Sequence, residues 1–211
     1  MNGPVQPRSQ GALTSRRVPL PWPADREFKI LSIDGGGIKG IYPACLLARL
    51  EETYLGGQSI AEYFDLITGT STGGIIALAL SVGIPARNIA DLYMNRGQEI
   101  FPKARFGRLG RAWAALRHLA YYRYDRTALA SLLSDTFSNR TLDQAKSRLC
   151  IPSCDGQFGD VYIFKTPHHP DFKKDGAQLM TTAAMATAGG PTIFRPPEGG
   201  GYPLLGGGNL G

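Results

Sequence analysis

The 211-residue sequence has no run of 18 uncharged apolar residues, whereas a helix that crosses a bilayer needs about 20. We therefore predict no membrane-spanning segment. Residues 1–26 also lack a continuous apolar stretch and are rich in proline and arginine, which argues against a signal peptide. We expect a flexible leader at 1–26, one domain at 27–211 and a location in the cytoplasm.

Cysteine is scarce, with three residues. Two of them, Cys150 and Cys154, have the spacing C-x-x-x-C, which matches no strong metal-binding pattern. We expect reduced thiols, no metal and no cofactor.

Acidic residues number 17 against 23 basic ones, so the formal net charge is +6. A positive charge of this size suits an anionic partner such as a membrane surface, a nucleotide or a nucleic acid, and does not choose among them. The sequence is compatible with an oligomer and does not determine the oligomeric state.

Strand and helix patterns alternate along the chain. We expect strands at 28–33, 63–68, 161–165 and 202–205, and helices at 41–54, 74–82, 88–98, 126–137 and 180–188. This alternation predicts an α/β fold with a mainly parallel sheet. Glycine-rich turns follow the first two strands, at the carboxyl ends where such sheets bind ligands.

The second turn, Gly69-Thr70-Ser71-Thr72-Gly73, fits the pattern G-x-S-x-G. A serine nucleophile needs a sharp strand-to-helix turn, and the flanking Gly69 and Gly73 remove the Cβ clashes of such a nucleophile elbow. The helix N-terminus behind Ser71 stabilises negative charge. We predict that Ser71 is the nucleophile of an acyl hydrolase, while a glycine-bounded turn with a capping serine stays open.

The first turn contains Gly35, Gly36 and Gly37, followed by Ile38-Lys39-Gly40. Its spacing is not that of a P-loop, since no Ser or Thr follows Lys39, and nothing else supports dinucleotide binding. With G-x-S-x-G downstream, we favour an oxyanion hole for acyl transfer. A nucleotide-phosphate site and a plain tight turn stay open.

Together these two motifs resemble the paired signature of patatin-like phospholipases, and Ala184 to Phe194 resembles that family's third block. The similarity covers roughly residues 28–210. The stretch from Phe164 to Asp171 further resembles a bacterial branch, in which some members are effectors of anti-phage systems switched on by cyclic oligonucleotides.

The resemblance implies a three-layer α/β/α fold and hydrolysis of membrane glycerophospholipid esters by a Ser–Asp dyad. Ser71 would attack the ester, and the amides of Gly35, Gly36 and Gly37 would hold the oxyanion. A cyclic-oligonucleotide activator is implied for the bacterial branch.

The sequence departs from the family at the dyad aspartate, because Gly206 stands where that aspartate belongs. Glycine cannot accept a proton, so activity is in doubt. Either the chain is a catalytically impaired patatin-fold protein that binds lipid or a cyclic nucleotide, or another residue takes the role. The candidates for that role are His168, His169 and Asp171, with Asp65 and Asp155 behind them.

Residues 103–126 interleave basic and aromatic side chains, among them Arg108, Arg111 and Trp113. This composition is typical of an interfacial segment on anionic lipid. A grip on a phosphorylated activator and stacking on single-stranded nucleic acid are alternatives. We favour peripheral contact with the inner membrane surface, because the expected substrate lies there, and expect no nucleic-acid partner.

Overall fold

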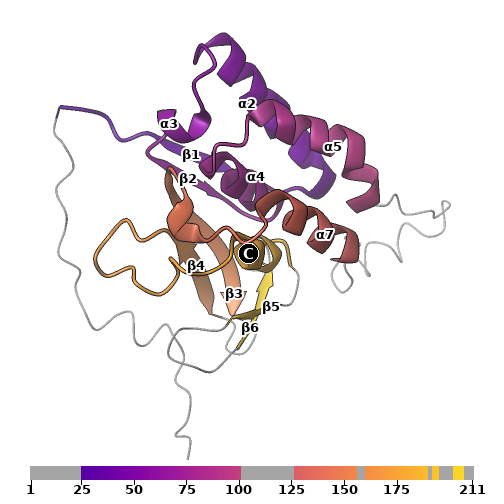
Figure 1. The fold of residues 1–211 in the computed structure, drawn as a ribbon, viewed down its shortest axis with the longest axis vertical. Helices are drawn as coiled ribbons and strands as arrows, with labels where there is room; N and C mark the ends of the chain where they lie inside the picture. The colour runs from indigo at the N-terminus through magenta and orange to yellow at the C-terminus, as the bar shows by residue number, and fades with distance from the viewer. Residues whose placement is uncertain (1–24, 101–125, 156–159, 190–191, 195–201, 207–211) are drawn as a thin grey trace, which may run out of the picture.

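The computed structural model describes residues 25–100, 126–155, 160–189, 192–194 and 202–206, and Figure 1 shows their arrangement. Residues 1–24 of the leader predicted at 1–26, and the segment with Arg108, Arg111 and Trp113, lie outside the described residues.

Strands and helices alternate through the first two thirds of the described chain. In order, the elements are β1 (Ile30–Ile33), the 3₁₀ helix η1 (Gly37–Gly40), α2 (Ile41–Thr53), α3 (Ile60–Tyr63), β2 (Leu66–Gly69), α4 (Thr72–Ser81), α5 (Ala86–Ile100), α7 (Arg126–Phe137), the 3₁₀ helix η2 (Leu142–Gln144), β3 (Arg148–Asp155), β4 (Val161–Lys165), α8 (Met180–Thr187), β5 (Thr192–Phe194) and β6 (Tyr202–Gly206).

The six strands in the described part of the chain form one mixed sheet. β1, β2 and β3 are parallel neighbours, while β4 and β6 pair antiparallel with β3, and β5 pairs antiparallel with β6. The expectation of a mainly parallel sheet holds for β1–β3 and is corrected for the rest. The chain between β3 and β4 is too short for the crossover that a parallel pair requires, which takes about a dozen residues.

One face of the sheet is packed against helices. α4 contacts β1, β2 and β3, and α8 contacts β3, β5 and β6. The strand side chains on this face are buried, among them Ile33, Ile67, Leu149, Ile151 and Phe164. The residues between them in the strands, such as Ile30 and Ile163, are more exposed. The core therefore lies between the sheet and α4 and α8, beneath the turn that follows β2.

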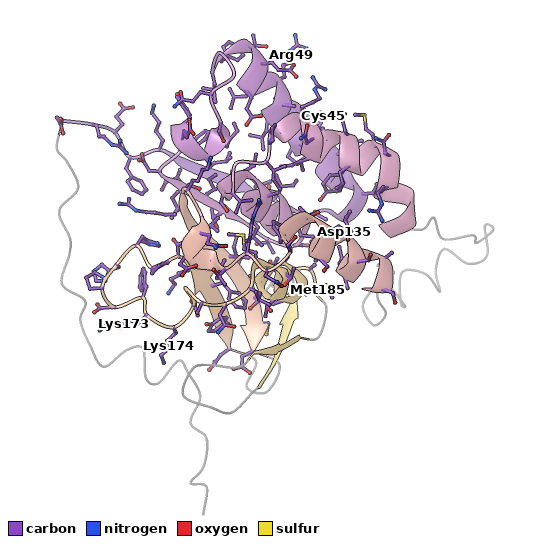
Figure 2. The ribbon with its side chains drawn as sticks, in the orientation of Figure 1. Cys45, Arg49, Asp135, Lys173, Lys174 and Met185 are labelled. Atoms are coloured by element: carbon purple, nitrogen blue, oxygen red, sulfur yellow. The ribbon has the colours of Figure 1, made fainter. Side chains whose placement is uncertain are left out.

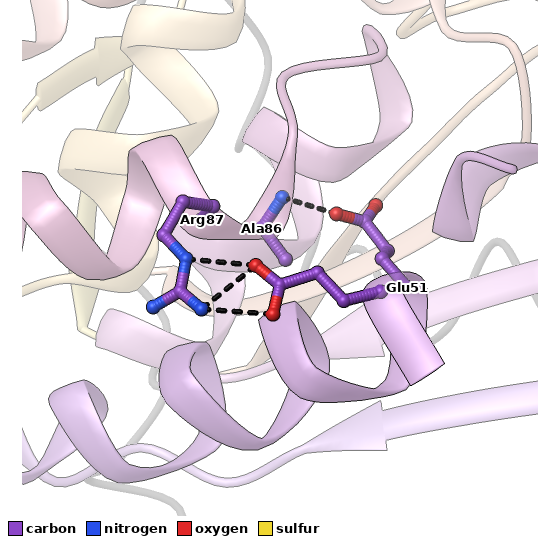
Figure 3. Close-up of polar contacts among 4 residues, drawn as sticks. Glu51, Ala86 and Arg87 are labelled. Carbon is purple, nitrogen blue, oxygen red and sulfur yellow. Dashed lines mark hydrogen bonds and ion pairs between the residues drawn. The ribbon is translucent and has the colours of Figure 1, made fainter. Parts of the chain in front are cut away.

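A buried carboxylate fixes α2 relative to the next elements (Figure 3). Glu51 Oε1 accepts from the amide of Ile60, 3.1 Å away, and Oε2 accepts from the amide of Ala86, 2.7 Å away. Beside it, exposed Glu52 pairs with Arg87 through both carboxylate oxygens. Because the first turn of a helix leaves its amides unpaired, Glu51 satisfies the N-termini of α3 and α5 together.

Most predicted elements are confirmed within a few residues. The strand expected at 63–68 begins later, at Leu66, because Ile60–Tyr63 form the helical turn α3, capped by the Ser59 side chain. The sequence patterns missed β3 and β5. Among the described helices, none is both long and apolar enough to cross a membrane.

Candidate active site

Ser71 occupies a strained turn between β2 and α4. Its backbone has φ 56° and ψ −124°, a region that costs about 1–3 kcal/mol for a residue with a side chain. A Cβ on Gly73 would lie 2.1 Å from the Ile33 carbonyl oxygen, and one on Gly69 would lie 2.4 Å from the Gly73 carbonyl oxygen. Both flanking positions therefore admit only glycine, as the elbow motif predicts.

The glycine loop after β1 lies directly against this turn. A Cβ on Gly35 would be 2.7 Å from the Thr70 carbonyl oxygen and 3.0 Å from Ser71 Cβ. Gly37 adopts φ 60°, which favours glycine. The structure thus brings the two motifs together at one edge of the sheet.

The Gly36 amide is engaged inside the protein. Its N–H donates to Thr72 Oγ1 over 3.1 Å, and Thr72 is buried at the start of α4. This bond fixes the glycine loop to the elbow.

A second buried threonine holds the backbone of Ser71 itself. The Ser71 N–H donates to Thr187 Oγ1 over 3.0 Å, and Thr187 ends α8. A Cβ on Gly74 would lie 2.7 Å from Thr187 Cγ2, so the close approach of α4 and α8 depends on a glycine there. Neither Thr72 nor Thr187 was predicted to matter, although the first lies in the serine motif and the second in the family's third block.

The register of β3 places Gly206 at the level of Ser71. β4 pairs with one edge of β3 from Cys150 to Cys154. β6, which pairs with Ser153 to Asp155, must therefore lie along the opposite edge of β3, the edge that pairs with β2 nearer the amino end of β3. Thr68 pairs with Cys150 and Gly206 with Ser153. β2 ends at Gly69 and β6 ends at Gly206 along this same edge of β3, so the turn with Ser71 follows β2 at the end of the sheet where Gly206 lies.

A side chain at position 206 would point to the helix-packed face. Directly paired residues of antiparallel strands share a face, and Ser153, the partner of Gly206, is fully buried there. This is also the face against which α4, which begins directly after Ser71, is packed.

The histidine candidates lie at the other end of the sheet. Lys165 ends β4 and pairs with Cys150 near the amino end of β3, so His168, His169 and Asp171 follow in the opposite direction from Ser71. Thr166, directly after β4, already bonds to Leu149 on the amino side of Cys150. The structure therefore does not bring these three candidates to Ser71.

His168 has a structural setting of its own. Thr166 Oγ1 accepts from the Leu149 amide and lies 2.7 Å from His168 Nδ1. Burial, followed by the positive charges of Arg148 and Lys165, lowers the pKa of His168 below its ordinary value of 6.5. A neutral ring that accepts the Thr166 hydroxyl proton fits this environment.

The two reserve carboxylates differ in place. Asp65 accepts from the Lys29 amide and pairs with Arg26, before β2 begins, so it lies at the amino end of the sheet. Asp155 is buried at the carboxyl end of β3, opposite Leu204. Of these two, Asp155 is the one at the carboxyl end of the parallel strands, which is also the end where Ser71 lies.

A strained serine elbow, a glycine loop against it and an α/β sheet define a site of the serine acyl hydrolase class. The patatin-like phospholipase family model matches residues 31–210. The chain therefore belongs to the patatin-like phospholipase family, which confirms the predicted three-layer α/β/α fold class and the resemblance read from the motifs.

Two relatives are cGAMP-activated phospholipases. The one from Vibrio cholerae is 36% identical over 177 residues, 81% of this chain and 50% of the relative. The one from Pseudomonas aeruginosa is 36% identical over 168 residues, 79% of this chain and 48% of the relative. The chain thus spans about half the length of these relatives.

Among solved structures, VipD from Legionella pneumophila is similar with a TM-score of 0.51 and 14% identity, over 88% of this chain and 47% of VipD. At this identity the likeness concerns the fold alone.

Proposed function

We propose that this chain is the acyl-hydrolase domain of a phospholipase, with Ser71 as its nucleophile. The observation that carries the proposal is the contact of Gly35 with Ser71 at a turn held at φ 56°. Such a turn exposes the serine hydroxyl beside backbone amides, which is the arrangement that acyl transfer requires.

The chemistry follows from this geometry. Ser71 Oγ attacks the ester carbonyl carbon, and the carbonyl oxygen gains the negative charge. We assign its stabilisation to the amides of Gly35 and Gly37, because the Gly36 N–H already donates to Thr72. Collapse of the intermediate releases the alcohol with the serine proton and leaves an acyl-serine, which water hydrolyses to the fatty acid.

The weak point of this mechanism is the proton acceptor, since Gly206 offers none. The second candidate function is therefore a patatin-fold domain that binds lipid or a cyclic nucleotide without turnover, and Gly206 is the observation that favours it. Asp155 is the carboxylate whose place at the carboxyl end of β3 makes it the candidate substitute.

A fluorophosphonate probe and a short-chain ester separate these functions. We expect the probe to label the parent chain at Ser71 and not the Ser71→Ala variant. We expect Gly206→Asp to raise ester hydrolysis by about 100-fold or more, since removing one member of a catalytic unit costs several orders of magnitude. Asp155→Asn in the parent background shows whether Asp155 supplies residual activity.

Each outcome decides one point. A Gly206→Asp variant no faster than the parent would contradict the assignment of position 206. Equal labelling of the parent and Ser71→Ala would contradict Ser71 as nucleophile. Labelling without turnover in the parent, together with lipid binding, would support the second candidate function.

The relatives' names support activation by a cyclic nucleotide, since two of them are cGAMP-activated phospholipases. Because Phe164 to Asp171 also resembles a bacterial branch with anti-phage effectors, we propose that the whole protein is a phospholipase effector in antiviral defence, activated by a cyclic oligonucleotide. Titration of the protein with cGAMP, monitored by calorimetry and by ester hydrolysis, tests the activator.

We also propose peripheral contact with the inner membrane surface from the cytoplasm. Besides Arg108, Arg111 and Trp113, a described surface on α2 supports it. Tyr42 and Leu46 are 74% and 57% exposed, one turn apart on the helix that begins directly after the glycine loop. Figure 2 shows Arg49 on the outer side of the same helix. Exposed apolar residues with basic neighbours suit an anionic lipid surface.

A further inference from the structure

We propose that Thr187 is a positioning residue whose hydroxyl holds the backbone amide of Ser71 and thereby fixes the strained turn of the nucleophile. The role rests on the proposed function of Ser71. It is carried by the 3.0 Å bond from Ser71 N–H to Thr187 Oγ1 and by the burial of Thr187, which is 1% exposed.

The turn needs such a contact because its backbone is unfavourable by itself. A residue with φ 56° and ψ −124° persists only where the surroundings determine its conformation. On the α4 side of the Ser71 Cα, the Ser71 carbonyl accepts from the Ile75 N–H. On the other side, the peptide between Thr70 and Ser71 is held at both ends, because its carbonyl accepts from the Gly73 N–H and its N–H donates to Thr187 Oγ1. The direction of the Cα–Cβ bond is therefore set from both sides, and Thr187 is the contact that comes from outside the turn.

The hydroxyl and the methyl group of Thr187 have separate tasks. A Cβ on Gly74 would lie only 2.7 Å from the Thr187 methyl carbon, Cγ2. The methyl group therefore fills the space that is left by the missing side chain of Gly74. The hydroxyl oxygen reaches past it to the Ser71 amide. Substitutions can therefore remove one group and keep the other.

The contact also links the nucleophile to the segment that ends at position 206. Thr187 is the last residue of α8, and the chain then forms β5 and β6, which ends at Gly206 opposite Ser153. Thr187 therefore connects the turn with Ser71 to the part of the chain that leads, through β5 and β6, to Gly206.

Two variants separate the hydroxyl from the methyl group. Thr187→Val keeps the shape and loses the hydrogen bond, whereas Thr187→Ser keeps the hydroxyl. We expect fluorophosphonate labelling of Ser71 to be about 10- to 100-fold slower in Thr187→Val, because a misplacement of about 1 Å can cost 100-fold in rate. In Thr187→Ser, labelling should stay within about threefold of the parent, as expected when the critical hydrogen bond is retained. Rates are compared at a temperature where thermal melts show each variant folded.

A second readout does not depend on activity. In the parent, the Ser71 amide should exchange slowly with solvent hydrogen, and this protection should be lost in Thr187→Val and kept in Thr187→Ser. An unprotected Ser71 amide in the parent overturns the proposal even if Thr187→Val does not fold. Parent-like labelling in Thr187→Val, or equally slow labelling in both variants, overturns it as well.

The two proposals fail in different ways. If the parent is not labelled at Ser71 at all, the hydrolase function fails, and amide exchange alone decides the role of Thr187. If the parent is labelled and both variants match it, the hydrolase function stands and the positioning role fails.

Discussion

At the scale of single residues, the site joins groups that are distant in the chain. Gly35, Ser71 and Thr187 come from three segments, and Gly35 and Thr187 each lie against Ser71 at the carboxyl end of the parallel strands. The glycines allow the backbone segments to lie close together. The buried hydroxyls of Thr72 and Thr187 accept hydrogen bonds from the amides of Gly36 and Ser71. In the proposed mechanism activity depends on position 206, where the pairing with Ser153 would direct a side chain to the same face.

His168 gives a test of pH dependence at this scale. Its pKa is lowered in the folded protein, so below pH 6.5 the unfolded chain binds more protons than the folded one. We expect the free energy of unfolding to fall as the pH drops below 6.5, and His168→Asn to flatten this dependence. Denaturant melts from pH 7.5 to 5 measure the effect.

The same variant tests whether His168 is catalytic. Because the register places it at the opposite end of the sheet from Ser71, fluorophosphonate labelling of folded His168→Asn should match the parent. A large loss of labelling would contradict the placement of His168 away from the nucleophile.

At the scale of elements, the sheet and its helices are held by a few buried polar contacts. Glu51 joins α2 to the starts of α3 and α5. Asp175 accepts from the Tyr162 hydroxyl and the Lys165 amide, which ties the loop before α8 to β4. These contacts help to position α2, which follows the glycine loop, and α8, whose Thr187 accepts from the Ser71 amide.

The adjacent glutamates of α2 provide a matched pair of variants. Glu51→Ala leaves two buried amides without an acceptor, at about 1–3 kcal/mol each, so the free energy of unfolding should fall by about 2–5 kcal/mol. Glu52→Ala removes an exposed ion pair worth about 1 kcal/mol or less. Urea melts measure both, and equal losses would contradict the role of Glu51.

At the scale of the whole molecule, the positive charge and the exposed apolar side of α2 bear on the membrane proposal. Replacing both Tyr42 and Leu46 with serine should weaken binding to anionic vesicles by about tenfold or more, because buried apolar area is lost at the lipid surface. Tyr54→Ser is the control, since Tyr54 is 77% exposed at the far end of α2. Vesicle sedimentation measures binding, and an unchanged double variant would contradict this surface.

Much of the fold could be predicted from the sequence because its signals are local. The glycines around Ser71 serve a turn within five residues, and the apolar run after them makes a buried helix, so both elbow and helix follow from neighbouring residues. β3 was missed because its register depends on three other strands. α3 was missed because its start depends on the Ser59 cap and on Glu51.

The sequence by itself determined the serine motif, the glycine loop, the family and the absence of an aspartate at position 206, because each is a matter of residue type at short spacing. Only the tertiary structure decided which groups meet. It placed Gly206 opposite Ser153, toward the end of the sheet where Ser71 lies, and the histidines toward the other end, and it engaged the Ser71 amide with Thr187. Such contacts arise from strand register and helix packing, which join segments that no local pattern connects.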